Sequence, residues 1–180
     1  EVATDRGSYP YDFLVSAMGC RVVPEEVEGM AERMGSDVHT FYTLDGALAM
    51  QPALERMTEG RLVIDICEMP IKCPVAPLEF AFLADYHFRQ KGIRDRIRIS
   101  LVTPYTGAFT KPNANRVLSR VAAAKGIEVV ANFAISAVDA DGRRIRTFDG
   151  RTVDYDLLCA IPPNLGPAVI DDAGLGDGAG

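Results

Sequence analysis

The feature that most constrains the fold is a regular alternation of short apolar strands and helices between residues 61 and 130. Strands are expected at residues 62–66, 97–102 and 127–130, with helices at 76–90 and 113–124 between them. The strands are continuous apolar runs, which is typical of strands covered on both faces of a parallel sheet. The order strand, helix, strand, helix, strand therefore predicts a three-layer α/β fold with a central parallel sheet.

The pattern changes after residue 130 to shorter strands separated by polar turns. Strands are expected at 133–138, 144–148 and 152–161, and Asp141 with Gly142 is a good hairpin turn. We expect a small antiparallel β excursion, followed by a strand that rejoins the parallel sheet.

Upstream, residues 11–18 read as a buried strand that Gly19 closes, and residues 22–37 as a connecting segment. A helix is expected at 43–57, with Thr43 as its N-cap and with a kink or division at Pro52. Residues 166–180 are expected to be a flexible tail, because the glycines at its end follow no strand: Gly174, Gly176, Gly178 and Gly180.

Composition excludes several classes of function. The net charge of −6 argues against nucleic acid as a partner, because non-specific affinity for phosphates rests on clustered Lys and Arg. No apolar stretch approaches a membrane span of about 20 residues and no signal peptide is recognisable, so a cytoplasmic location is expected. With 2 His and no CxxC pair, no metal site is expected.

A family resemblance rests on two kinds of motif. Residues 11–15 (YDFLV) and 155–159 (YDLLC) echo each other, and the first run continues to Ala17, Met18 and Gly19. Residues 69–80 (MPIKCPVAPLEF) and 92–96 (GIRDR) add a cysteine loop before a helix and a turn before the next strand. Nearly the whole chain resembles FAD-dependent pyridine nucleotide-disulfide oxidoreductases, which have two dinucleotide-binding domains, and within them the sulfide:quinone oxidoreductase branch.

The resemblance implies a Rossmann-like FAD/NAD(P)-binding fold in an internal fragment of a longer enzyme. Residues 1–39 would be a remnant of the flavin domain with its connecting segment, and 40–165 the second, NADH-domain-like unit. Ala17, Met18 and Gly19 would contact FAD, although Met18 stands where the family usually has Thr. The parent protein would oxidise sulfide or a persulfide and pass the electrons to a quinone. It would associate peripherally with the inner membrane.

Four cysteines are candidates for the chemistry. Cys73 is favoured as the redox cysteine, because Lys72 and the N-terminus of the following helix can stabilise a thiolate. Glu79, six residues later, favours the helix dipole, and the resemblance implies a role in proton transfer. Cys159 is interpreted as a small buried hydrophobe, Cys67 is open between the two interpretations, and Cys20 is interpreted as structural.

A nicotinamide cofactor is not expected. The loop at 67–75 contains no glycine, and Thr103 and Pro104 stand where an acid would bind the ribose. The isolated chain is therefore expected to bind no cofactor and to have no turnover, with the rest of its own chain as partner. Two alternatives stay open: an NAD(P)H-dependent flavoprotein disulfide reductase domain, and a non-catalytic Rossmann-like module.

Overall fold

The computed structural model describes residues 1–139 and 141–176, so Gly178 and Gly180 of the predicted tail lie outside the described residues. The chain divides into two compact units, Glu1–Arg21 with Gly166–Gly180, and Val22–Leu165. Whether the predicted boundaries at 39/40 and 165/166 separate domains of a parent protein stays a prediction.

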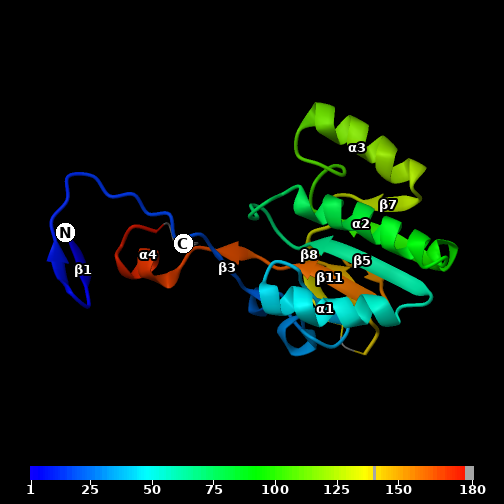
Figure 1. Ribbon diagram of the computed structural model, residues 1–180, viewed down its shortest axis with the longest axis horizontal. Helices are drawn as coiled ribbons and strands as arrows, with labels where there is room; N and C mark the ends of the chain where they lie inside the picture. Colours follow the sequence, from blue (N-terminus) through cyan, green and yellow to red (C-terminus); the bar gives the residue numbers. More distant parts are fainter. Residues whose placement is uncertain (140, 177–180) are drawn as a thin grey trace. The chain divides into compact units, whose positions relative to one another are not determined.

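The larger unit is built on a five-stranded parallel sheet (Figure 1). In spatial order its strands are β4 (Val38–His39), β11 (Leu157–Ile161), β5 (Gly60–Ile66), β6 (Ile97–Val102) and β7 (Ile127–Val130). The predicted parallel pairing of β5, β6 and β7 is confirmed, and so is the return of the chain to this sheet through β11.

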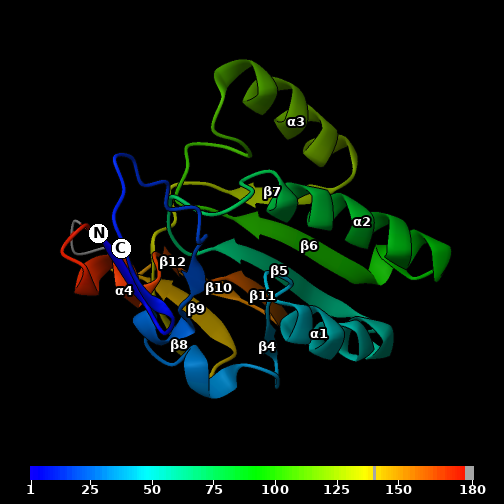
Figure 2. The ribbon, with the colours of Figure 1, turned by 60° about the vertical axis from the view of Figure 1, so that its left-hand side comes forward.

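Three helices cover one face of this sheet: α1 (Leu44–Arg56), α2 (Ala76–Gln90) and α3 (Pro112–Ala124) (Figure 2). Alternate residues of β5 point toward them, since Leu62, Ile64 and Ile66 belong to the same buried cluster as the helices. The predicted cap of α1 is also confirmed, because the Thr43 side chain accepts a hydrogen bond from the Gly46 amide.

The opposite face of the sheet packs against a small antiparallel sheet. Its strands are β8 (Ile135–Asp139), β9 (Arg144–Thr147) and β10 (Thr152–Asp154). Val63 of β5 faces this side, and it shares a buried cluster with Cys67, the residue after the strand, and with Phe133 and Ile145. Helices, parallel sheet and antiparallel sheet form three layers, which confirms the predicted Rossmann-like α/β fold (Figure 2).

Shorter elements complete the larger unit. The connecting segment forms the 3-10 turns η1 (Pro24–Glu26) and η2 (Ala31–Arg33). It also contributes Val27 and Met30 to the buried cluster that the parallel and antiparallel sheets share. A third turn, η3 (Arg94–Arg96), precedes β6, and β3 (Arg21–Val22) pairs with β12 (Asn164–Leu165).

Two predictions about strands are wrong. Residues 11–18 form no strand, and Phe13 is 93% and Val15 87% exposed. A buried strand needs a neighbour for its backbone groups, and the described residues pair none with this segment. Residues 152–161 are two strands, because Tyr155 and Asp156 carry the chain from the antiparallel sheet to the parallel one and Asp156 bonds Arg61.

Pro52 does not divide α1, so that alternative of the prediction is wrong. The helix continues through this residue from Leu44 to Arg56. Pro52 removes the hydrogen bond to the carbonyl of Leu48, but both residues are exposed, so water can satisfy that carbonyl.

The smaller unit contains a hairpin of β1 (Val2–Thr4) and β2 (Gly7–Tyr9), and the short helix α4 (Ala168–Asp172). Helix α4 lies within the segment expected to be a tail. Among the described residues of the whole chain, no helix has the length and apolar character needed to cross a bilayer.

Candidate functional site

The candidate site lies at the carboxyl edge of the parallel sheet, where ligands of open α/β sheets bind. Cys73 lies in the loop that joins β5 to α2, three residues before the helix begins, and its side chain is exposed. The predicted position and exposure of Cys73 are confirmed, whereas its chemical role stays a prediction.

The backbone of Cys73 has a left-handed conformation, with φ of 57°. Residues with a Cβ rarely adopt this region, and they do so where the surroundings hold them there. The Cys73 carbonyl accepts two hydrogen bonds, from the Tyr42 hydroxyl at 2.9 Å and from the Ala76 amide at 3.1 Å. The loop is therefore held by a residue from a distant part of the chain as well as by the helix that follows.

Lys72 makes contacts that the sequence did not predict. Its Nζ donates to the Tyr42 carbonyl at 2.9 Å and lies 5.7 Å from the centroid of the Tyr42 ring. Its backbone amide donates to Asn164 Oδ1 at 3.0 Å. The ammonium group thus binds the neighbouring segment, and stabilisation of a Cys73 thiolate by Lys72 stays a prediction.

Glu79 lies in the first turn of α2, as predicted, and is exposed. Among the interactions of the described residues, none joins Glu79 to Cys73. Both side chains are exposed, and the role of Glu79 in proton transfer stays a prediction.

The other cysteines have different surroundings. Cys159 is fully buried in the core beneath the helices, which confirms its interpretation as a small hydrophobe. Cys20 is half-buried and belongs to the smaller unit. None of the four cysteines forms a disulfide bond in the described part of the chain.

Cys67 takes part in a buried pair that sequence reasoning missed. Its Sγ donates to Asp65 Oδ2 at 3.3 Å, and the other carboxylate oxygen, Oδ1, has no partner among the described residues. Burial raises the pKa of Asp65 to about 7, although the bond from Cys67 opposes this. Burial and the neighbouring acid also raise the pKa of Cys67, so this cysteine is kept as an unreactive thiol.

The positions where a nicotinamide dinucleotide would bind are occupied by unsuitable residues. The loop after β5 has no glycine that would let the backbone approach a pyrophosphate, and its Ile71 is buried against the core. After β6, the side chain of Thr103 is buried and accepts a hydrogen bond from the Tyr105 amide. These residues do not fit the cofactor.

The predicted flavin contacts lie in the smaller unit. Gly19 has a φ of 75°, a conformation that glycine adopts without strain. Ala17 and Met18 line a cavity of about 550 Å³ whose other walls include Tyr11 and Ile170. The role of Ala17, Met18 and Gly19 as flavin contacts stays a prediction.

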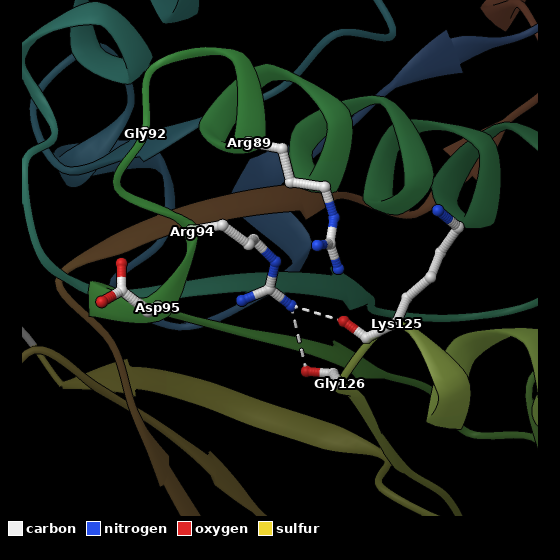
Figure 3. Close-up of a pocket in the computed structure, with 6 residues that line it drawn as sticks. All are labelled: Arg89, Gly92, Arg94, Asp95, Lys125 and Gly126. Atoms are coloured by element: carbon white, nitrogen blue, oxygen red, sulfur yellow. Dashed lines mark hydrogen bonds between the residues drawn. The ribbon is translucent and has the colours of Figure 1, made fainter.

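A second feature of the larger unit, at the C-terminal end of α2, has a structural role. Fully buried Asp85 is bound by Arg89, Arg94 and Lys125, at 3.0, 2.7 and 3.0 Å. Figure 3 shows these cations around a shallow pocket, with Arg94 donating to the carbonyls of Lys125 and Gly126. Burial alone would raise the pKa of Asp85, but the three cations outweigh it and lower the pKa to about 2.

Two of these cations lie close in sequence to the acid that they bind. Arg89 and Arg94 compensate a buried acid that lies on α2, four and nine residues earlier. The sequence did contain a signal for this buried ion cluster, because Asp85 lies on the apolar face of a predicted helix and is followed by Arg89 and Arg94. Among the described residues, no group of three or more His, Cys, Asp or Glu side chains is arranged to hold a metal ion.

Comparisons with known proteins agree with the motifs. No protein-family model matches the chain. The mitochondrial sulfide:quinone oxidoreductase of Dictyostelium discoideum is 28% identical over 177 residues, which cover 94% of this chain and 38% of that protein. An NADH dehydrogenase-like protein of Mycobacterium tuberculosis is 28% identical over 170 residues, covering 88% of this chain and 40% of that protein.

A solved structure shows the same relationship. The sulfide:quinone oxidoreductase of Aquifex aeolicus superposes with a TM-score of 0.75 and 27% identity, over 97% of this chain and 41% of that one. The predicted resemblance is confirmed: the chain is related to sulfide:quinone oxidoreductases and has the fold of pyridine nucleotide-disulfide oxidoreductases. It spans about two fifths of the length of these relatives.

Proposed function

We propose that this relative of the sulfide:quinone oxidoreductases is the middle part of an FAD-dependent enzyme that oxidises sulfide or a persulfide. Sulfide would give up two electrons to the flavin, which passes them to a quinone, and Cys73 would hold the oxidised sulfur. The observation that carries the proposal is the position of Cys73. It is an exposed cysteine at the carboxyl edge of the parallel sheet, directly before a helix.

Each of the neighbouring residues supports a part of this chemistry. The N-terminus of α2 begins three residues after Cys73, and helix N-termini favour thiolates. Glu79 would accept or return protons, since sulfide and its thiol products change protonation during the reaction. Ala17, Met18 and Gly19 would form one wall of the flavin site, and the remaining walls would belong to other parts of the parent protein.

The membrane is a further proposed partner of the parent. Quinones are apolar and dissolve in the bilayer, so an enzyme that reduces them must reach its surface. A peripheral association of the parent with the inner membrane would meet this need.

Anaerobic reduction of the flavin in the intact parent protein tests the proposal. Sulfide is expected to bleach the flavin absorbance of the wild type, and Cys73→Ser is expected to lower the rate by at least about 100-fold. The matched control is Cys20→Ser, which removes a partly accessible cysteine of the smaller unit and should leave the rate within about twofold. An unchanged rate in Cys73→Ser would remove Cys73 from the mechanism.

A second candidate function is an NAD(P)H-dependent flavoprotein reductase. It is supported by the Mycobacterium tuberculosis relative, whose name describes it as NADH dehydrogenase-like. The residues after β5 and β6 argue against it. Steady-state oxidation of NADH by the intact parent protein, with or without quinone, would favour this candidate over the first.

A further inference from the structure

The left-handed backbone of Cys73 needs an explanation beyond the presence of a loop. An L residue at φ of 57° is disfavoured, and it relaxes to negative φ when nothing holds it. The loop is also exposed at Lys72, Cys73 and Pro74, so packing of these side chains does not impose the conformation. Two hydrogen bonds to the Cys73 carbonyl do restrain this backbone.

Tyr42 provides that restraint from another part of the sheet. It follows β4, the edge strand, and its side chain is only 8% exposed because the ring is packed in the core beneath the helices. The hydroxyl donates to the Cys73 carbonyl at 2.9 Å. Because the ring is packed in the core, the position of its hydroxyl is fixed, and the hydrogen bond restrains the Cys73 carbonyl.

The same tyrosine is held in place by the residues that it orders. Lys72 Nζ donates to the Tyr42 carbonyl, and the adjacent ring of Phe41 stacks on Phe80 of α2 at 4.8 Å. Asn164, which follows β11, accepts from the Lys72 amide. The ends of β4, β11 and β5 are thus joined around one exposed cysteine.

We propose that Tyr42 is a positioning residue, whose hydroxyl holds the Cys73 backbone in the conformation that directs its thiol toward the reacting sulfur. This inference rests on the proposed function. It makes one claim about the backbone conformation of Cys73 and one about the rate of sulfide oxidation. Burial raises the pKa of Tyr42, so the hydroxyl keeps its proton and remains a donor throughout the physiological range.

The test compares Tyr42→Phe with a matched control, Tyr86→Phe. The first removes only the hydroxyl and keeps the ring in the core, and the second removes an exposed hydroxyl on α2, where Tyr86 is 61% exposed. Amide hydrogen exchange and the ¹³Cα chemical shift of Cys73 report the backbone. In Tyr42→Phe, exchange of the Ala76 amide should be at least about tenfold faster and the Cys73 shift should move toward negative φ.

The functional readout is the steady-state oxidation of sulfide by the intact parent protein. Tyr42→Phe is expected to lower kcat at least about tenfold and to leave KM for sulfide within about twofold, because misplacement of a reacting group affects the chemical step. Alkylation of Cys73 by iodoacetamide should persist, since the thiol stays exposed. Tyr86→Phe should match the wild type in every measurement.

The outcomes separate the two proposals. Unchanged exchange and an unchanged Cys73 shift in Tyr42→Phe overturn the inference. Faster exchange with unchanged kcat also overturns it, provided that Cys73→Ser abolishes turnover. Full turnover in Cys73→Ser would overturn the proposed function instead, and the exchange data would then decide by themselves whether Tyr42 holds the loop.

Discussion

Cys73 differs from the other cysteines of the larger unit in a way that its chemistry depends on. Cys67 and Cys159 are buried, and burial raises the pKa of both thiols, whereas Cys73 is exposed. Thiolates are the reactive form, so Cys67 and Cys159 are disfavoured both by lack of access and by their raised pKa. The sequence placed Cys73 in the right loop, but nothing in the sequence indicated its left-handed backbone or its bond to Tyr42.

Thiol labelling tests this difference. We expect iodoacetamide to alkylate Cys73 of the folded protein at least about tenfold faster than Cys67 or Cys159, with peptide mass spectrometry as the readout. Unfolding in urea should make the three equally reactive, which is the control. Rapid labelling of Cys159 with an inert Cys73 would mean that the functional cysteine has been assigned wrongly.

The ionisation of Asp65 gives the fold a pH dependence. Its pKa is about 7 in the folded protein and 3.8 as a free side chain, so the folded state binds the proton more tightly. The free energy of unfolding therefore falls as pH rises between these two values. The isosteric variant Asp65→Asn has no proton to lose and should escape this fall.

Urea unfolding at pH 5 and pH 8 measures the effect. Between these pH values, the free energy of unfolding should fall by about 3 kcal/mol more in the wild type than in Asp65→Asn. The reason is that the folded-state pKa of Asp65 lies about two units above the lower pH. Asp139→Asn is the control, because that carboxyl is exposed. Parallel pH profiles of wild type and Asp65→Asn would show that Asp65 is ionised in the folded state.

At the scale of the elements, Arg94 joins its own turn, η3, to three other pieces of structure. Its guanidinium binds Asp85 on α2 and the Ile97 carbonyl at the start of β6. It also binds the Lys125 and Gly126 carbonyls in the turn between α3 and β7, as Figure 3 shows. Its own side chain is only 15% exposed. Loss of Arg94 would leave a buried carboxylate with two of its three cations and three carbonyls without this donor.

We expect Arg94→Ala to lower the free energy of unfolding by about 3 kcal/mol, the lower end of the cost of removing one partner from a buried pair. Arg98→Ala is the matched control, since Arg98 is exposed in the same basic stretch and should change stability by less than about 0.5 kcal/mol. Chemical denaturation measures both. Equal effects would mean that Asp85 does not depend on Arg94.

The elements of the parallel sheet could be predicted because continuous apolar runs of strand length alternate with helices. The failures have physical causes. Residues 11–18 have the pattern of a strand, but a strand is defined by its neighbours, and no local pattern supplies them. Tyr155 and Asp156 interrupt an apolar run because Asp156 bonds Arg61, a contact across 95 residues. The Asp65–Cys67 and Tyr42–Cys73 pairs likewise depend on side chains that only the fold brings together.

At the scale of the larger unit, the two ends of the parallel sheet have different tasks. The carboxyl edge holds Cys73 in an exposed loop, whereas the C-terminal end of α2 is fastened by Asp85 and its three cations. The Asp85 cluster ties α2 to the start of β6 and to the turn before β7, and at the other edge Tyr42 binds the backbone of the Cys73 loop. Contacts therefore hold the larger unit together at both ends of the sheet, and the proposed chemistry lies in the loop at its carboxyl edge.

The same division bears on cofactor binding by the isolated chain, for which calorimetric titration is the measurement. We expect NADH to bind with no useful affinity, because the loop after β5 lacks the glycines that would admit a pyrophosphate and Thr103 replaces the acid that would bind the ribose. FAD is expected to bind no better, because Ala17, Met18 and Gly19 provide only one wall of its site. The intact parent protein, with its flavin, is the positive control for FAD. Micromolar binding of NADH by the isolated chain would contradict this view of the second dinucleotide domain and would favour the reductase alternative.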